Sequence, residues 1–190
     1  GVSDGAPGLI KAFEEVFYKT LRQRCLFHKK GNVLSKAPSE IHSQMKIDLN
    51  AVYYASNLEA AHLNAELFRK TYGKEHPSIL KCFEDDLEAC LQHLKCPAKH
   101  RRRITTTNPL ERIFGEENRR SKVIPRYFNE KSGLKLIYAT LIRAAQRWQR
   151  IIITFNEQAK ILELRDKLGH VAVKEKNVKS KINKKTYALR

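Results

Sequence analysis

The apolar positions in the middle of the chain follow a helical period. Between residues 29 and 100, large apolar side chains recur every three or four positions, which places them on one face of a helix. The helical stretches cover residues 41–53, 58–68 and 79–91. Turn-forming residues separate them, near Pro38, Ser56–Asn57, Gly73–Pro77 and Pro97. We therefore predict an all-helical unit of three or four helices.

The first 28 residues carry two different patterns. Residues 1–4 have the character of a strand that is ending, and the spacing of Leu9, Phe13 and Phe17 predicts a helix after Pro7. Residues 21–28 alternate in the way that a strand does. Because a lone strand is not stable, a strand end, a helix and a strand require further sheet partners. We therefore expect the sequence to be a piece of a longer protein.

The second half predicts further amphipathic helices. One begins near Pro109, which suits a first helical turn, after residues 105–108, each of which can cap a helix. The apolar face of this helix is expected to pack on a core, and it consists of Leu110, Ile113 and Phe114. A helix over 131–150 is expected to turn a second apolar face inward, made of Leu134, Ile137, Tyr138, Leu141, Ala144, Ala145 and Trp148. Its outer side would present a basic ridge to phosphates, made of Lys135, Arg143, Arg147 and Arg150. One more helix is predicted over 156–168, and the lysine-rich tail beyond Gly169 is expected to be mobile.

The net positive charge of the chain indicates a class of binding partner. The chain has 37 Lys and Arg against 20 Asp and Glu, and residues 101–150 alone hold 13 basic and four acidic side chains. Such a balance favours polyanions, nucleic acid first among them. The acidic run at 84–88 could hold a cation, but we favour a solvated helix face. No apolar run approaches the roughly 20 residues of a membrane helix and no signal peptide is visible, so we expect a cytoplasmic protein without membrane contact.

Two acidic residues stand at positions suited to chemistry. Asp4 lies where the first strand ends and a helix begins, the place where open α/β sheets put ligand-binding residues, and a helix N-cap is the alternative. Glu111 lies in the first turn of a helix, where the helix-end amides favour an ionised carboxylate. Neighbouring arginines would add to that effect, namely Arg101, Arg102, Arg103 and Arg112. A carboxylate among arginines indicates a phosphate or metal site.

The cysteines follow no disulfide framework. Cys90, Cys96 and His100 have a spacing that could suit zinc, but no Cys-x-x-Cys pair is present, and Cys90 falls on the apolar face of a helix. We therefore favour buried thiols. Cys25 and His28 have a ligand-like gap, which taken alone is too common to indicate a site.

Three linked motifs resemble the Mutator-type family of bacterial insertion-sequence transposases, which belongs to the DDE superfamily. They are SDGAPGL at 3–9, LRQRCLFHKKGNVLSK at 21–36, and ITTTNPLER at 104–112 with RRSKVIPRYF at 119–128. The motifs occur in the family's order and cover residues 1 to about 150. The resemblance implies a catalytic domain of ribonuclease-H-like fold, with an all-helical insertion before the helix that bears the catalytic Glu.

The resemblance also assigns residues. Asp4 matches the second Asp of the catalytic triad and Glu111 matches the Glu, so both are expected to be catalytic and to bind Mg²⁺ or Mn²⁺. Cys25 and His28 match the family's Cys-x-x-His motif, and Asn108 belongs to the motif that bears the Glu. His28 would either contact the scissile region or brace the strand end. The first Asp is expected upstream of residue 1, which makes this segment the C-terminal part of the catalytic domain.

The expected fold is therefore mainly α with a short β portion (α+β), a partial ribonuclease-H-like fold that lacks its N-terminal strands. Residues 1–28 would be the core remnant and 29–100 the helical insertion. Residues 101–150 would hold the Glu-bearing helix and a C-terminal core helix, and 151–190 a helix and the basic tail.

The implied function is metal-dependent DNA cleavage and strand transfer at insertion-sequence ends, carried out by the complete protein as a homo-oligomer. Its partners would be those ends and the target DNA, and this segment alone is expected to bind DNA without cleaving it. The alternative is a non-catalytic, basic, helical nucleic-acid-binding protein, in which Asp4 is a helix cap and Glu111 neutralises arginines. Either way, the expected DNA-binding residues are Arg101, Arg102, Arg103, Arg112, Arg119, Arg120, Lys122 and Arg126.

Overall fold

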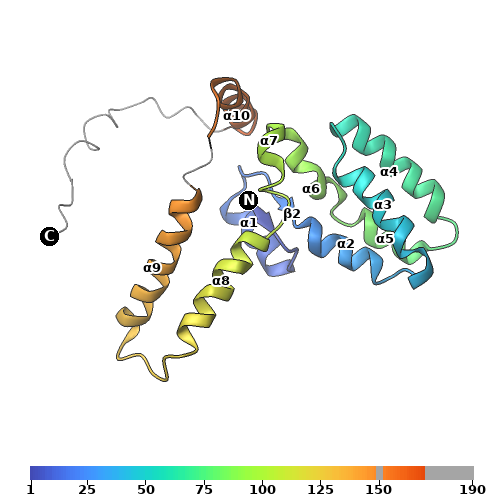
Figure 1. The fold of residues 1–190 in the computed structure, drawn as a ribbon. Coiled ribbons are helices and arrows are strands. Elements are labelled where there is room, and N and C mark those ends of the chain that lie inside the picture. Colours follow the sequence, from blue (N-terminus) through green and yellow to red (C-terminus); the bar gives the residue numbers. More distant parts are fainter. Residues whose placement is uncertain (149–151, 170–190) are drawn as a thin grey trace.

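The computed structural model describes residues 1–148 and 152–169, and shows a mainly helical protein with one two-stranded sheet (Figure 1). The elements fall into three groups along the chain: a small strand–helix–strand unit, a helical lobe, and a long helical hairpin followed by one more helix. The basic tail that the sequence predicts beyond Gly169 lies outside the described residues.

The N-terminal unit is a parallel pair of strands joined by a helix. Strand β1 (Val2–Ser3) leads into helix α1 (Pro7–Val16) and strand β2 (Gln23–Arg24). The strands pair in parallel, with Val2 opposite Gln23 and Ser3 opposite Arg24. The predicted order of strand end, helix and strand is therefore confirmed.

The predicted extent of the second strand was wrong. Only Gln23–Arg24 are extended, and helix α2 (Leu26–Leu34) begins two residues later, so Cys25 caps a helix and His28 lies in its first turn. The alternation over residues 21–28 concealed a helical spacing, because Leu26, Lys29 and Val33 are the buried residues of α2. The Leu26 N–H donates to Thr105 O at 2.8 Å, outside the strand ladder.

The helical lobe has turns where the sequence predicts them. After α2 come the short helix η1 (Ser39–Ile41), α3 (His42–Tyr53) and α4 (Leu58–Tyr72), and Asn57 caps α4 by accepting from the Ala60 N–H. The third predicted stretch is interrupted: it forms α5 (Pro77–Glu84), α6 (Leu87–Leu91) and η2 (Gln92–Lys95). Asp86 has a left-handed backbone, φ 59°, which ends the first of these helices and starts the next.

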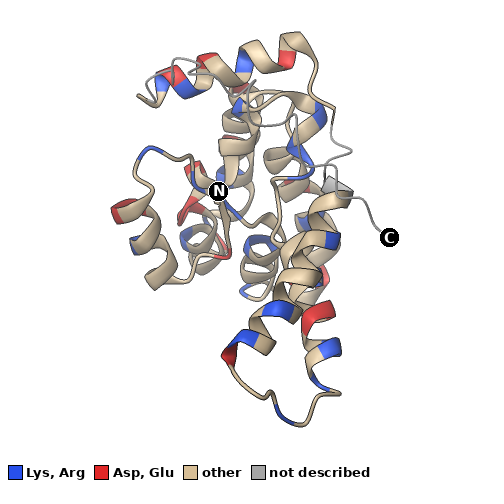
Figure 2. Cartoon of the chain, turned by 90° about the vertical axis from the view of Figure 1, so that its left-hand side faces the viewer, with Lys and Arg blue, Asp and Glu red and all other residues tan. Residues whose placement is uncertain are grey.

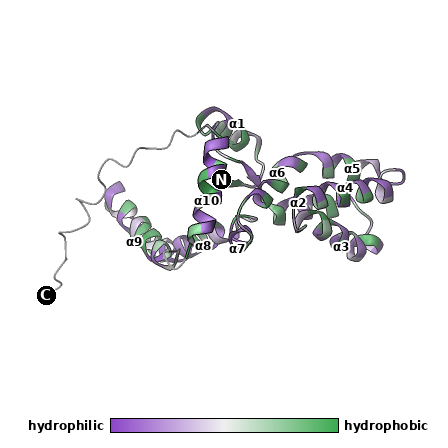
Figure 3. Ribbon diagram, turned by 90° about the horizontal axis from the view of Figure 1, so that it is seen from above, coloured by the Kyte–Doolittle hydropathy of each residue, from purple (hydrophilic) through white to green (hydrophobic). Residues whose placement is uncertain are grey.

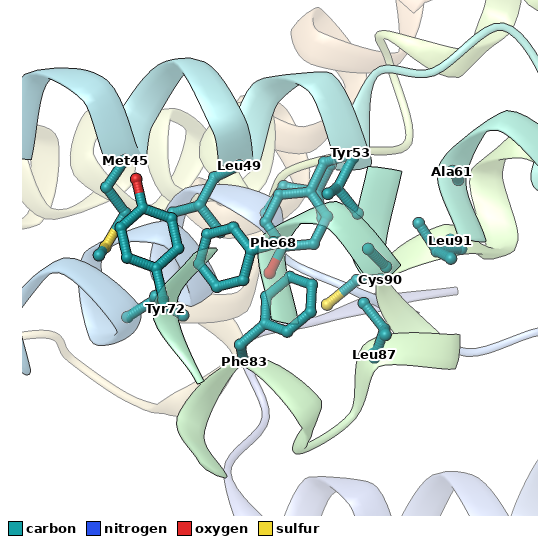
Figure 4. Close-up of a cluster of buried hydrophobic side chains, with 14 of the residues drawn as sticks. Met45, Leu49, Tyr53, Ala61, Phe68, Tyr72, Phe83, Leu87, Cys90 and Leu91 are labelled. Atoms are coloured by element: carbon teal, nitrogen blue, oxygen red, sulfur yellow. The ribbon is translucent and has the colours of Figure 1, made fainter. Parts of the chain in front are cut away.

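The buried apolar core lies inside this lobe (Figure 4). Phe68 of α4 and Phe83 of α5 stack with ring centroids 4.3 Å apart, and Tyr53 of α3 lies 6.3 Å from Phe83. Burial also raises the pKa of the Cys90 thiol to about 12, which agrees with the prediction of a buried thiol. The core cluster runs from Leu26 to Leu94 and includes no residue of the helices that follow.

The helices that follow the lobe lie outside its buried core. Helix α7 (Ala98–Arg101) leads to α8 (Asn108–Ser121) and α9 (Glu130–Trp148), which lie side by side as a hairpin, and α10 (Phe155–Lys167) follows (Figures 1 and 3). A capping box of Thr154 and Glu157 starts α10, and the Glu157 carboxylate lies 3.5 Å from His100. None of the helices that the structure describes is long and apolar enough to cross a membrane.

The predicted inward faces of α8 and α9 are exposed, which corrects the sequence analysis. Phe114 on α8 is 52% exposed and Leu134 on α9 is 55% exposed. Ile113 and Ala144, which were predicted to face inward, do line the space between α8 and α9, together with Thr140, which is 5% exposed. Leu134, Ile137, Tyr138 and Leu141 instead line a separate, open surface on the outer side of α9.

Candidate active site

Asp4 directly follows strand β1, at the carboxyl end of the parallel pair. Its Oδ1 accepts a hydrogen bond from the Ala6 N–H at 3.1 Å, so the side chain closes a tight turn. The N-cap of α1 is Ala6, and no side chain caps that helix. Asp4 is therefore an exposed turn residue, and its Oδ2 makes no hydrogen bond to any described residue.

Gly5 gives this turn its shape. Its φ is +88°, and a Cβ there would overlap the guanidinium of Arg24. Arg24 is 7% exposed, and its Nε and Nη1 have no partner among the described residues. The turn that carries Asp4 thus packs directly on a buried cation, and only glycine fits its second position.

Glu111 lies in the first turn of α8, as the sequence predicts. Its Oε1 accepts a hydrogen bond from the Thr107 hydroxyl at 2.5 Å and lies 3.9 Å from His28 Nε2. Within the described residues no arginine forms an ion pair with it, so the arginines expected around Glu111 do not contact its carboxylate directly. Thr107 is the N-cap of α8 by position. Its hydroxyl, however, donates to Glu111 and makes no capping hydrogen bond to the described backbone amides of the helix.

Cys25 joins the three parts of the site. Its N–H donates to Ser3 O at 2.7 Å, one residue before Asp4, and its Sγ accepts from the Thr107 N–H at 3.4 Å. Cys25 is fully buried. The end of β1, the start of α2 and the start of α8 therefore meet at one residue, although more than 100 residues separate Asp4 from Glu111 along the chain (Figure 1).

The basic run before α8 divides into two kinds of residue. Arg101 donates to three backbone carbonyls, those of Cys96, Ser56 and Leu94, at 2.7–3.0 Å. These hydrogen bonds connect the segment before α4 to the end of the lobe, so the Arg101 guanidinium has a structural role. Arg102 and Arg103 instead line an open groove of about 830 Å³. Its other walls are Val2, Lys99, Ile104, Thr106, Thr107, Pro109 and Leu110.

A second basic groove lies between α8 and α9. Arg112, Arg120 and Arg143 line this space of about 520 Å³. Glu116 also lines it, and hydrogen bonds from Arg119 and Arg120 lower the pKa of its carboxyl to about 2. Glu116 is thus held by arginines on its own helix, which sets it apart from Glu111.

The remaining predicted residues lie nearby on the surface. Lys122 ends α8, and Arg126 is exposed in the connection to α9, where basic residues gather at the tip of the hairpin (Figure 2). Asn108 is the first residue of α8 and is half-buried.

The donor set suits a hard divalent cation only in part. Asp4 and Glu111 each have one carboxylate oxygen without a described contact, and such oxygens are the ligands that Mg²⁺ and Mn²⁺ prefer. Over residues 1–148 and 152–169, no group of three His, Cys, Asp or Glu side chains is placed to hold a metal ion. The described site can therefore supply two carboxylates and requires a further ligand.

Sequence reasoning missed two residues. Thr107 was one of four possible helix caps, and its spacing of four residues before Glu111 was the available signal, because side chains at i and i+4 meet on a helix. Arg143 was predicted to lie on the outer basic ridge of α9, but it lines the groove toward α8. Its direction depends on which side of α9 packs on α8, and periodicity alone does not determine that.

The sequence motifs at the end of β1, around Cys25 and at the start of α8 indicate the class of protein, the transposases, and comparison with known proteins supports that class. The family described as "Transposase, Mutator family" matches residues 1–151. The chain belongs to this family.

Individual relatives agree with that assignment. The chain is 34% identical over 150 residues to the transposase for insertion sequence element IS6120 of Mycolicibacterium smegmatis, which covers 79% of this chain and 46% of the relative. It is 31% identical over 147 residues to the transposase for element IST2 of Acidithiobacillus ferrooxidans, covering 77% and 50%. The transposase for IS256 in transposon Tn4001 of Staphylococcus aureus is 24% identical over 153 residues. The chain thus spans about half the length of the first two relatives.

Proposed function

We propose that this chain is the C-terminal part of the catalytic domain of a DDE transposase. In the complete protein this domain would cut DNA at insertion-sequence ends and join those ends to target DNA, in the bacterial cytoplasm and as a homo-oligomer. The observation that carries the proposal is the junction at Cys25, which ties the end of β1, beside Asp4, to the helix start that bears Glu111.

A partial ribonuclease-H-like fold is part of the proposal. It is supported by the parallel pair β1 and β2 with a helical crossover, and by the helical lobe that lies between β2 and α8 in the chain. In this reading, residues 1–28 belong to the nuclease core, 29–100 to the insertion, and 101–150 to the core again. Residues 151–190 would follow the catalytic domain.

Asp4 and Glu111 would hold the divalent cations, together with an acidic residue that the family resemblance places upstream. When bound, such ions activate the attacking oxygen and neutralise the leaving oxygen of an in-line displacement at phosphorus. The chain's own residues would orient the reacting groups. The turn of Asp4 is fixed by Gly5 and Arg24, and Glu111 is fixed by Thr107 and His28.

The basic grooves would hold the DNA backbone. Arg102, Arg103 and Lys99 line one, and Arg112, Arg120 and Arg143 line the other, with Arg119, Lys122 and Arg126 on the adjoining surface. Arginine contacts to phosphate add affinity without sequence preference and make binding depend on salt. We exclude Arg101 from this surface because its guanidinium is used by three carbonyls.

Fluorescence anisotropy with duplex DNA tests the binding surface. Replacing Arg112 or Arg143 with Gln is expected to reduce the slope of log affinity against log salt by about 1 for each phosphate that the variant no longer neutralises. Arg165 on α10 lies outside both grooves, so Arg165→Gln is the matched control and should leave the slope unchanged.

A nicking assay tests the catalytic part. Residues 1–190 alone should bind supercoiled plasmid and leave it intact with Mg²⁺. A chain extended upstream to the length of the relatives should nick it, and Asp4→Asn or Glu111→Gln should abolish that nicking. Nicking that survives both substitutions would favour the non-catalytic DNA-binding alternative.

A further inference from the structure

Cys25 and Thr107 stand between the strand end and Glu111, and neither is a metal ligand in the proposed function. We propose that they form a hydrogen-bonded relay that holds one oxygen of Glu111 and leaves the other oxygen for a divalent cation. This inference rests on the proposed metal-binding role of Glu111, and it assigns a positioning role to a buried thiol and a hydroxyl.

Counting protons fixes the direction of each hydrogen bond. Thr107 Oγ1 lies 2.5 Å from Glu111 Oε1 and 3.3 Å from Cys25 Sγ. A hydroxyl has one proton, and an ionised carboxylate has none to give, so Thr107 donates to Glu111. The 2.5 Å separation is that of a charge-assisted hydrogen bond. Because the single hydroxyl proton serves Glu111, we assign the thiol of Cys25 as the donor in the 3.3 Å contact between its Sγ and Thr107 Oγ1.

The same sulfur also receives a hydrogen bond. The Thr107 N–H donates to Cys25 Sγ at 3.4 Å, so Cys25 accepts from the backbone of Thr107 and donates to its side chain. This double contact fixes both the position and the rotamer of Thr107. It also accounts for the missing helix cap, because the Thr107 hydroxyl is turned away from the amides of α8.

The relay is anchored in the body of the protein. Cys25 is fully buried, its N–H donates to Ser3 O at 2.7 Å, and the next amide, that of Leu26, donates to Thr105 O at 2.8 Å. These two hydrogen bonds connect the strand end beside Asp4 and the segment before α8 to adjacent residues at the start of α2. A shift of Thr107 would break its hydrogen bonds to both Cys25 and Glu111.

The side-chain contacts to Glu111 are made to one oxygen of its carboxylate. The Thr107 hydroxyl and His28 Nε2 both approach Oε1 of Glu111, at 2.5 and 3.9 Å. Within the described chain no hydrogen bond or ion pair reaches Oε2. Glu111 is therefore oriented through one oxygen and keeps the other for a ligand, which is how hydrogen-bonded carboxylates serve at metal sites.

Infrared spectroscopy of the metal-free chain tests the donor assignment. The S–H stretch of Cys25 is identified by its disappearance in Cys25→Ala, and the three other thiols serve as internal references. We expect Thr107→Val to move this band to higher wavenumber, since the S–H then has no acceptor, and Thr107→Ser to leave it in place. An unchanged band in Thr107→Val would overturn the relay. If Thr107→Val does not fold, Thr107→Ala is measured in its place.

Manganese titration followed by amide NMR tests the consequence for metal binding. The paramagnetic loss of the Glu111 amide signal should need at least about tenfold more Mn²⁺ in Thr107→Val than in the wild type. Thr107→Ser should resemble the wild type. If Glu111→Gln leaves the signal loss unchanged, the proposed metal role of Glu111 fails. If Glu111→Gln abolishes it and Thr107→Val does not weaken it, the relay alone is refuted.

Discussion

The helical lobe and the α8–α9 hairpin place their apolar side chains in opposite ways. The lobe buries them in one cluster that runs from Leu26 to Leu94, whereas α8 has no buried residue and α9 turns its large apolar side chains outward. Burial of apolar surface is the main source of folding free energy. The difference indicates that the lobe supplies the stability of the chain, while the hairpin carries charge and the candidate carboxylate Glu111.

The largest expected effect comes from the centre of the lobe. Phe83→Ala removes a fully buried ring that stacks on Phe68, and should lower the free energy of unfolding by about 3–5 kcal/mol. Phe114→Ala on α8 removes the same ring from an exposed site and should change it by no more than about 0.5 kcal/mol. Urea denaturation measures both. Equal decreases would contradict the division between lobe and hairpin.

The turn at Asp4 should be the next most sensitive position. Gly5→Ala requires a positive φ and moves Arg24, so we expect a decrease of about 1–3 kcal/mol in the free energy of unfolding. Gly8 lies in α1 with open space around it, and Gly8→Ala should be neutral or stabilising. Thermal unfolding compares the two variants. Tolerance of alanine at Gly5 would show that the turn does not depend on close packing with Arg24.

A smaller effect should depend on pH. The Arg22 guanidinium donates two hydrogen bonds to Asp86, at 2.6 and 3.0 Å, and holds the pKa of that carboxyl below its usual range. A lowered pKa in the folded state means that the pair stabilises the fold above about pH 4, the usual value for Asp, and stops doing so as pH falls through the lowered pKa.

Asp86→Asn should therefore cost about 1–2 kcal/mol at pH 7, and the cost should shrink as pH falls below about 4 and through the lowered pKa. Asn also tolerates the left-handed backbone of this position, so the substitution removes the charge without straining the backbone. Asp85→Asn, at the exposed neighbouring residue, is the control and should show no such pH dependence. Denaturation at several pH values measures the difference. A cost that stays constant with pH would exclude the ion pair as its origin.

The smallest effect should appear on the outer face of α9. Leu134→Gln changes a side chain that is 55% exposed, and should alter the free energy of unfolding by no more than about 0.5 kcal/mol. Leu49→Gln, at a fully buried position of α3, is the matched control and should prevent stable folding or cost several kcal/mol. A large decrease from Leu134→Gln would mean that this face is covered in solution.

The sequence predicted the lobe well because its apolar period and its turn residues agree, as at Asn57, which caps α4. It failed at residues 21–28, where a short alternating pattern suited both a strand and a helix, and the burial of Leu26, Lys29 and Val33 on one face of α2 depends on contacts distant in sequence. It also failed on α9, because periodicity identifies an apolar face but does not tell what covers it.

The candidate site was predicted by resemblance to known motifs more than by physical pattern. Asp4 and Glu111 were named from their motifs, but the contacts that join them, through Cys25 and Thr107, link residues about 80 positions apart and leave no periodic signal. Arg101 shows contacts that the sequence could not indicate. Its place in a basic run suggested a DNA contact, and its three carbonyl partners are visible only in the fold.

The proposal that Asp4 and Glu111 share a divalent cation, together with an upstream acidic ligand, is tested most directly by a manganese titration of the upstream-extended chain and of its Asp4→Asn variant. With a shared site, the amide signals of Gly5 and Glu111 should weaken at the same Mn²⁺ concentration in the unsubstituted chain, and Asp4→Asn should protect both. Loss of the Glu111 signal at an unchanged concentration in Asp4→Asn would contradict a shared site.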